Sequence, residues 1–316
     1  MKVLVTGASG FLGRHLTRHL AAQGCTVVAA SRTSIPARDD MMVASGTIAS
    51  LDGRTEWKSF LERVDVVVHL AGVAHRAIEN QDSLAAELQR VNVEATVRLY
   101  EQCRTYGVAH FIFISSLAAI TSRGIGRIDD ATPPTPSTPY GRSKRSAEEA
   151  LISLQSRGGV DYTILRPPLI YGAGNPANMG RLLQLVRSGL PLPLAAVRNQ
   201  RSFLYVGNFC DAVYHCLALA GSRNRMFYLS DGEDLSTPEL IRRMAHAARV
   251  PVRLFPFPLG ILRTLAAAQP DGALAKLIGS LYVEISAVRT ALEWSPPFSV
   301  DAGLHLSYSR DLVDRP

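Results

Sequence analysis

The sequence predicts an α/β fold in which a parallel sheet is covered by helices on both faces. Short apolar runs rich in β-branched residues alternate with amphipathic stretches through the first half of the chain. These runs are nearly continuous, without the polar/apolar alternation of half-exposed strands, and this is typical of strands buried on both faces. After Arg166 the alternation gives way to segments rich in Gly and Pro, which predicts a smaller second domain interleaved with the first.

The elements follow from these patterns in chain order. Strands are expected at residues 2–6, 25–31, 64–70, 109–115 and 160–166, and helices at residues 11–23, 84–106 and 140–157. The second half predicts a helix at 178–188, a strand at 202–206, a helix at 211–220, a short strand from 226 and a helix that opens at the Ser236 cap. Residues 1–168 are expected to form the larger domain, to which 202–228 return, and 169–201 with 229–316 the smaller one.

Composition narrows the class of protein. The 316 residues carry 34 basic and 27 acidic side chains, a net charge of +7 that suits anionic ligands such as phosphates. No dense basic cluster or zinc-finger spacing is present, so neither a nucleic-acid partner nor a metal is expected. The four cysteines lie in apolar stretches without a CxxC motif, which favours buried free thiols and a reducing compartment. Without a signal peptide or a run of about 18 apolar residues, a cytoplasmic protein without membrane insertion is expected.

Glycines are concentrated at the first strand-to-helix junction. Gly7, Gly10 and Gly13 have the spacing GxxGxxG, directly between the first strand and the first helix. A dinucleotide pyrophosphate needs close backbone approach and the free amides of a helix N-terminus, here at Phe11 and Leu12. The first domain is therefore predicted to be a Rossmann-type, doubly wound dinucleotide-binding domain.

The end of the second strand indicates which dinucleotide is bound. NAD sites usually place a carboxylate there for the ribose hydroxyls, whereas NADP sites supply an arginine. This strand ends Ser31-Arg32-Thr33, so Arg32 can face a 2′-phosphate with Ser31 as a hydroxyl partner. NADP(H) is favoured, and NAD(H) remains the alternative.

A candidate for proton transfer lies on the predicted helix 140–157. Tyr140 and Lys144 share one helix face, and a lysine charge beside a phenol is expected to lower the pKa of the tyrosine toward the working pH. Ser116 follows the strand at 109–115, at the sheet edge where α/β sites gather. It can hydrogen-bond the same substrate oxygen as Tyr140.

These motifs resemble the extended short-chain dehydrogenase/reductase family, within it the nucleotide-sugar epimerases and reductases. The resemblance covers nearly the whole chain, and the residues that carry it are Gly7, Gly10, Gly13, His69-Leu70-Ala71-Gly72, Asn92, Ser116, Tyr140, Lys144 and 165–172 (LRPPLIYG). It implies that Tyr140 is the acid/base, that Lys144 holds the nicotinamide ribose and tunes Tyr140, and that Ser116 binds the reacting C4 oxygen.

The resemblance also assigns binding residues. Leu70, Ala71, Gly72, Asn92 and Pro167 would line the cofactor path. Asn178 would begin the helix that contacts the diphosphate of a nucleotide sugar, although a helix cap explains this residue nearly as well. Arg201 would grip the same phosphates, for which a guanidinium fork is well suited.

The residues after Ser116 narrow the reaction. Sugar dehydratases of this family place an Asp-Glu pair where this chain has Leu117 and Ala118, and the 3/5-epimerases need a Cys or Lys that residues 117–121 do not offer. Hydride chemistry at C4 remains. The NADP(H) interpretation favours a 4-ketoreductase over a UDP-sugar 4-epimerase acting on UDP-glucose or UDP-N-acetylglucosamine. A non-catalytic NADP-binding sensor is the third alternative, although the catalytic positions are all filled.

The C-terminal part is similar to a subgroup from bacterial polysaccharide loci. The segments 230–240 and 294–297 carry this similarity, and the subgroup includes UDP-4-keto-6-deoxy-N-acetylglucosamine 4-reductases and UDP-glucose 4-epimerases. Two segments depart from the family pattern: Ile120-Thr121 replaces Tyr-Gly, and Gly46-Thr47-Ile48 replaces a Gly-Asp ending. The helices at 84–106 and 140–157 are either a two-fold homodimer interface, as in relatives, or simply part of the core.

Overall fold

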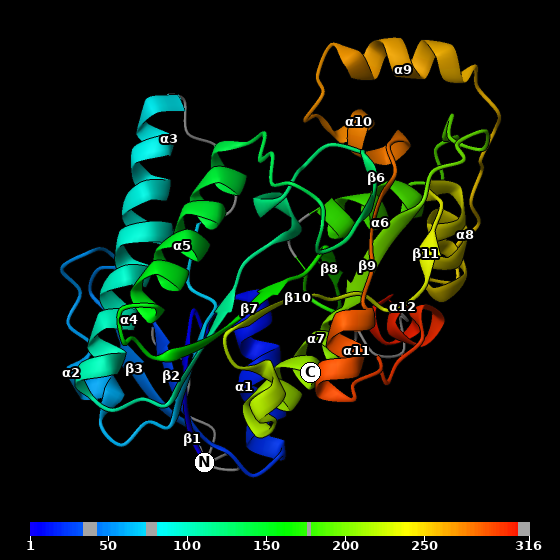
Figure 1. Cartoon of the computed structure of the whole chain (residues 1–316). Helices are drawn as coiled ribbons and strands as arrows, with labels where there is room; N and C mark the ends of the chain where they lie inside the picture. Colours follow the sequence, from blue (N-terminus) through cyan, green and yellow to red (C-terminus); the bar gives the residue numbers. More distant parts are fainter. Residues whose placement is uncertain (34–42, 74–80, 176–177, 309–316) are drawn as a thin grey trace.

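A seven-stranded parallel sheet forms the centre of the computed structural model, which describes residues 1–33, 43–73, 81–175 and 178–308. Its order is β10-β7-β5-β4-β1-β2-β3, and every neighbouring pair is parallel (Figure 1). The strands are β1 (Lys2–Thr6), β2 (Thr26–Ser31), β3 (Val43–Thr47), β4 (Val66–His69), β5 (His110–Ile114), β7 (Asp161–Arg166) and β10 (Arg225–Tyr228). The predicted α/β fold class is confirmed.

Helices cover both faces of this sheet. One face packs against α1 (Phe11–Ala22), α7 (Val206–Ala218) and α11 (Ser286–Leu292). The other packs against α2 (Lys58–Leu61), α3 (Gln81–Leu88), α4 (Ala95–Thr105) and α5 (Pro139–Gln155). Val3 and Val5 belong to the first core and Leu4 to the second, because successive side chains of a strand point to opposite faces. The sheet is therefore doubly wound, as predicted.

A smaller sheet lies beside the carboxyl ends of the large one. It has the order β11-β9-β12-β6, with β8 paired to β9. Its strands are β6 (Gly126–Ile128), β8 (Leu169–Tyr171), β9 (Arg201–Tyr205), β11 (Asp234–Leu235) and β12 (Leu281–Val283). The helices α6 (Asn178–Arg187), α8 (Thr237–Ala247) and α12 (Val300–Tyr308) pack around it. Two further helices, α9 (Leu259–Ala267) and α10 (Ala273–Ile278), lie at one end of the molecule (Figure 1).

Two expectations need correction. The strand expected at 202–206 does not return to the large sheet: β9 pairs with β8, β11 and β12, whereas β10 does join β7. An apolar run predicts a strand but does not predict which strand pairs with it. Here β9 pairs with the neighbouring strand Leu169–Tyr171. The helix expected at 84–106 is interrupted by a π-helical segment, η1 (Gln89–Glu94), between α3 and α4.

A buried carboxylate ties the smaller sheet to its helices. The Asp231 side chain accepts hydrogen bonds from the Tyr205 backbone N–H (2.7 Å), the Asn208 amide (2.7 Å) and the Tyr171 hydroxyl (2.8 Å). These donors come from β9, α7 and β8, so one side chain satisfies polar groups from three elements. Burial raises the pKa of Asp231 to about 6, and the three donors oppose this rise.

Replacing this carboxylate is expected to destabilise the fold. Asp231→Ala leaves three donors without their acceptor, at roughly 1–3 kcal/mol for each buried group, so a loss of about 3 kcal/mol or more is expected in urea unfolding. Glu233→Ala is the control, because Glu233 is exposed and joins only a surface ion pair with Arg243. It should cost less than about 1 kcal/mol. Equal losses for the two variants would contradict the role of Asp231.

Candidate active site

The glycine loop between β1 and α1 has the backbone that a phosphate cradle needs. Gly7 has φ +68°, and a β-carbon there would lie 2.8 Å from the Ala71 backbone nitrogen. A β-carbon on Gly13 would lie 2.3 Å from the Gly7 carbonyl oxygen, so neither position tolerates a side chain. Gly10 is exposed and caps α1 without any side-chain hydrogen bond. The first amides of α1 are therefore left to a ligand, and the helix dipole favours an anion there.

Ser31 is the last residue of β2, and Arg32 follows it directly. Ser31 is buried and its hydroxyl donates to the Thr33 carbonyl, so it is engaged within the chain. Arg32 is exposed. No carboxylate stands at residues 31–33, and the segment 34–42 lies outside the described residues.

The predicted catalytic residues are brought together. Thr138 caps α5 by accepting a hydrogen bond from the Gly141 N–H (3.1 Å), and this sets Tyr140 in the first turn and Lys144 in the second. Ser116 follows β5 and hydrogen-bonds Tyr140. The three side chains thus come from two neighbouring elements at the carboxyl edge of the sheet, where α/β sites lie.

The pKa of Tyr140 shifts in the direction opposite to the one that the sequence predicted. Burial raises the pKa of Tyr140 to about 12, and the hydrogen bond to Ser116 only partly offsets this rise. Burial thus outweighs the lowering that the sequence predicted from the charge of Lys144, whose ammonium is held by other groups. Its Nζ donates to the Ile114 carbonyl (2.9 Å) and lies 4.6 Å from the centre of the Phe113 ring. A phenol with a pKa raised in this way is protonated at neutral pH, the form that can donate a proton.

Lys144 is buried, and its charge depends on a second buried group. Desolvation lowers the pKa of Lys144 to about 8, and the negative charge of Glu148 counteracts this fall. Glu148 lies four residues later on α5, on the same helix face. His69 also faces Lys144, but burial first and the lysine charge second lower its pKa to about 3. It stays neutral between the hydroxyls of Thr6 and Thr96.

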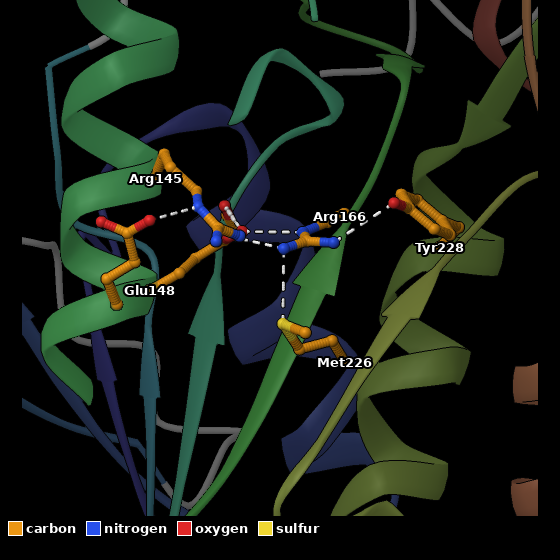
Figure 2. A network of polar contacts seen from close by, with 7 residues as sticks. Arg145, Glu148, Arg166, Met226 and Tyr228 are labelled. Atoms are coloured by element: carbon orange, nitrogen blue, oxygen red, sulfur yellow. Dashed lines mark hydrogen bonds and ion pairs between the residues drawn. The ribbon is translucent and has the colours of Figure 1, made fainter. Parts of the chain in front are cut away.

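An ion pair below the site holds Glu148 in place (Figure 2). Arg166 binds the Glu148 carboxylate with both sides of its guanidinium, at 2.9 and 2.7 Å. The Ser115 hydroxyl donates to the same carboxylate at 2.5 Å, and Arg145 lies 3.5 Å from it. Arg166 also donates to the Tyr228 hydroxyl at 3.2 Å. The network joins α5, β7 and β10 to the end of β5. None of the sequence motifs predicted this ion pair.

Two further residues predicted for the cofactor site, Asn92 and Gly72, lie near Lys144. Asn92, in η1, bonds both backbone groups of Val73 (2.8 and 2.9 Å) and the Ser143 hydroxyl (3.0 Å). A β-carbon on Gly72 would lie 2.9 Å from the Asn92 side-chain oxygen and 3.6 Å from the Lys144 Nζ, so only glycine fits between them. Asn92 therefore fixes the chain that follows β4, which explains the π-helical turn at a functional position.

One cavity of about 580 Å³ unites most of the predicted site. Its lining includes the predicted residues Phe11, Leu12, Leu70, Gly72, Ser116, Tyr140, Lys144, Pro167 and Arg201. The predicted residues Gly7, Gly10, Gly13, Ser31, Arg32, Ala71 and Asn92 are outside this lining. Asn178 is the first residue of α6, and its side chain lies outside the described residues.

Two cations line the part of the cavity formed by the smaller domain. Arg201 donates to the carbonyls of Lys276 (2.7 Å) and Gly279 (3.2 Å), and burial lowers its pKa to about 10, which leaves it charged. Lys276 lines the same cavity from α10. In the described part of the chain neither has a carboxylate at ion-pair distance. The sequence did not reveal Lys276, because one lysine in a short helix is typical of a solvated surface.

The segment after Ser116 carries no further proton-transfer group. Residues Leu117–Ala119 form the short 3-10 helix η2, capped by the Ser116 hydroxyl, which accepts the Ala118 N–H at 3.1 Å. Leu117 and Ala118 line the cavity beside Ser116. The position at which a dehydratase needs an acid and a base is therefore apolar in this chain.

Other observations concern the chain as a whole. The four cysteines are buried free thiols, as the sequence predicted. Across the residues that the structure describes, no three His, Cys, Asp or Glu side chains cluster in a way that could hold a metal ion. In the same residues, every helix is too short or too polar to cross a bilayer.

Comparisons with known proteins identify relatives that match nearly the whole chain. The chain is 30% identical over 308 residues to a "UDP-glucose 4-epimerase" of Vibrio cholerae, covering 95% of this chain and 92% of the relative. It is 28% identical over 294 residues to an "N-acetyl-alpha-D-glucosaminyl-diphospho-ditrans,octacis-undecaprenol 4-epimerase" of Escherichia coli O157:H7, covering 91% and 83%. The UDP-glucuronic acid 4-epimerase of Bacillus cereus, solved with NAD, shares the fold with a TM-score of 0.78 at 21% identity, covering 99% of this chain and 98% of that one.

The family follows from a match that extends from the first strand to the last strand of the large sheet. Residues 3–228 match the family described as "NAD dependent epimerase/dehydratase family". This range contains the glycine loop, Ser116, Tyr140, Lys144 and the Glu148–Arg166 pair. The protein is therefore an enzyme of the NAD dependent epimerase/dehydratase family, of the extended short-chain dehydrogenase/reductase type.

Proposed function

We propose that the enzyme is an NADP(H)-dependent 4-ketoreductase of a nucleotide-linked, UDP-type 4-keto-6-deoxy-N-acetyl sugar in bacterial surface polysaccharide synthesis. The observation that carries the proposal is the partly buried phenol of Tyr140, bonded to Ser116 at the wall of the cavity. Reduction of a ketone requires an acid beside the carbonyl oxygen. The apolar Leu117 and Ala118 leave dehydration without its acid and base.

The chain's own residues account for the proton movements. The glycine loop would hold a reduced nicotinamide dinucleotide by its pyrophosphate, and this cofactor would supply the hydride for C4. Ser116 and Tyr140 hold the carbonyl oxygen by hydrogen bonds, and Tyr140 donates its phenolic proton to that oxygen as the alcohol forms. The nearby ammonium of Lys144 stabilises the phenolate left behind, and Glu148 keeps this ammonium charged.

Charge placement supports the choice of ligands. Arg201 and Lys276 offer two cations to the diphosphate of a nucleotide sugar, and a guanidinium fork suits phosphate oxygens. Arg32 is exposed at the end of β2 and available to a 2′-phosphate, which favours NADP(H). The relative from E. coli O157:H7 carries an N-acetylated sugar diphosphate in its name, in line with an N-acetyl substrate.

A UDP-sugar 4-epimerase is the second candidate. The Vibrio cholerae relative and the B. cereus structure both carry 4-epimerase names, and the latter was solved with NAD. An epimerase would use the same Ser116, Tyr140 and Lys144 in both directions, with a cofactor that stays bound. For either reaction we propose a cytoplasmic location, which the four buried thiols favour, and a homodimer through α4 and α5.

The two reactions differ in what they consume. With a UDP-4-keto-6-deoxy-N-acetyl sugar, a ketoreductase should oxidise one NADPH for each sugar reduced, followed by nicotinamide absorbance. With UDP-glucose or UDP-N-acetylglucosamine alone, it should form no 4-epimer. Interconversion of those sugars without added cofactor, together with no NADPH loss on the keto sugar, would establish the epimerase instead.

Tyr140→Phe is expected to abolish turnover while leaving the cofactor site intact. The variant removes only the acidic O–H, so the rate should fall by about 10²-fold or more. NADPH affinity, measured by titration calorimetry, should change little. A variant with undiminished turnover would refute the assignment of Tyr140 as the acid.

Arg32→Ala is expected to weaken NADPH binding by about tenfold, because a charged hydrogen bond to the 2′-phosphate is lost. NADH affinity should stay the same, since NADH lacks this phosphate. Arg18→Ala, at an exposed position on α1, is the matched control and should change neither affinity. Equal weakening of NADPH and NADH by Arg32→Ala would contradict the NADP(H) assignment.

Glu148→Gln is expected to move the alkaline limit of activity to lower pH. Lys144 is charged below its pKa of about 8, and Glu148 raises that pKa. Without this charge the pKa falls further, so the ammonium is lost at a lower pH and the alkaline limb of kcat/KM should shift down by about one unit. The measurement is the pH profile of kcat/KM at a temperature where the variant is folded.

Two further variants separate charge from folding. Glu148→Gln leaves Arg166 buried and unpaired, at a cost of roughly 3–5 kcal/mol, so it is also combined with Arg166→Gln. The double variant should keep the shifted limb. Glu149→Gln, at an exposed position one residue on, should leave the profile unchanged. An unshifted limb in both Glu148 variants would contradict the role of its charge.

A further inference from the structure

One end of the molecule combines exposed apolar side chains with unpaired cations. We call residues 188–200 and 251–280, which include α9 and α10, the outer edge. Four of the ten large apolar side chains exposed in the described part of the chain lie on it: Leu190 (59% exposed), Phe255 (41%), Ile261 (49%) and Leu265 (58%). Figure 1 shows α9 at the extremity of the molecule. Apolar exposure is therefore concentrated at a projecting end.

The outer edge is packed and ordered from within. Leu262 and Ala266 form the inner face of α9 and are 4% and 6% exposed, and Leu262 belongs to a cluster that includes Leu274 and Leu277 of α10. Ile261 and Leu265, one turn apart, form an exposed flank of α9 about 100° around the helix from this inner face, and Arg263 lies on the opposite flank. The two chain segments are joined, because the Leu192 N–H donates to the Arg253 carbonyl at 2.8 Å. The outer apolar stripe is thus held in a fixed position while the inner stripe provides the packing.

The charged residues of the outer edge are nearly all basic. Its two segments hold a single acidic residue, Asp271, whereas the chain has 27 acidic residues in 316. Asp271 is itself occupied, since it accepts the Ser137 hydroxyl at 2.8 Å and lies 3.9 Å from Arg123. The basic residues of the outer edge are Arg198, Arg253, Arg263 and Lys276. The three arginines are exposed, and no carboxylate in the described residues lies at ion-pair distance from them.

We infer that the outer edge is a docking surface for a lipid bilayer that contains anionic headgroups. The exposed apolar side chains and the exposed arginines of the outer edge match the two layers of such a surface, acyl chains and negative headgroups. A second copy of the chain fits poorly, because two cationic edges would repel each other. A protein partner fits poorly too, since stable interfaces bury about 800 Å² per partner and the apolar residues here sit on a narrow projecting end.

Docking there would place the site next to the bilayer. Lys276 belongs to α10, which packs against α9, and it also lines the site cavity. The enzyme would bind reversibly and salt-dependently through one end, with its cavity close to the membrane surface. This inference concerns location and partner, and it stands independently of whether the reaction is reduction or epimerisation.

Vesicle co-sedimentation of the full chain tests the inference. Vesicles of phosphatidylcholine with phosphatidylglycerol should sediment the protein, and added salt or pure phosphatidylcholine should release it. Ile261→Ser with Leu265→Ser should weaken binding at least tenfold, and Arg263→Gln about fivefold. Leu219→Ser and Arg157→Gln, exposed positions elsewhere, are the matched controls and should bind as the parent does.

The outcomes are distinguishable. Thermal unfolding should be the same for all these variants, because each changed side chain is exposed. Turnover of soluble substrate should also be unchanged, so a failed reductase assay does not affect the vesicle result. No sedimentation with anionic vesicles, or weakening by the control variants equal to that by the outer-edge variants, would overturn the inference. So would a dimer in light scattering that Ile261→Ser with Leu265→Ser dissolves, because the stripe would then serve a second copy.

Discussion

The arrangement of the site depends on the ion pair between Glu148 and Arg166. Glu148 is wholly inaccessible to solvent and Arg166 nearly so, and two charges are removed from water only when each is fully satisfied. The guanidinium fork and the Ser115 hydroxyl provide this satisfaction. Ser115 directly precedes Ser116, Arg166 directly precedes Pro167, and Glu148 lies one turn after Lys144. A single buried carboxylate therefore ties α5 and β7 to the residue that follows β5, and with them the side chains that we propose to be catalytic.

The same carboxylate maintains the charge on which the chemistry relies. Lys144 is enclosed among Phe113, the Ile114 carbonyl and Gly72, a setting in which desolvation favours the neutral amine. The negative charge of Glu148 opposes that loss, whereas His69 remains neutral and neither adds to nor competes with the lysine charge. Burial therefore lowers the pKa of the Lys144 ammonium, and the charge of Glu148 raises it. Burial also strengthens the electrostatic effect of the ammonium on neighbouring groups. Packing at this point serves electrostatics as much as stability.

Much of this arrangement could be predicted from sequence, and the exceptions share a cause. The glycine loop, the strands of the large sheet and Ser116, Tyr140 and Lys144 are encoded locally, by spacing and hydrophobic period. The partner of β9 and the contribution of Lys276 arise from contacts between distant segments, which no local pattern contains. The direction of the Tyr140 pKa was wrong for a similar reason: the position of Lys144 in sequence predicts a nearby charge, but its ammonium is directed to the Ile114 carbonyl.

The protonation of Tyr140 bears on the direction of the reaction. Ketone reduction starts with the phenol protonated, and burial enforces this state with a pKa of about 12. Oxidation of a C4 hydroxyl, the first half of an epimerisation, needs the same oxygen as a proton acceptor, and burial opposes the phenolate that this step requires. Lys144 can stabilise a phenolate once one forms. In this arrangement its ammonium donates a hydrogen bond to the Ile114 carbonyl and lies over the Phe113 ring. Burial of the phenol therefore supports proton donation, the role that we propose for Tyr140, and the ammonium of Lys144 is the group that offsets burial when the phenol has to accept a proton.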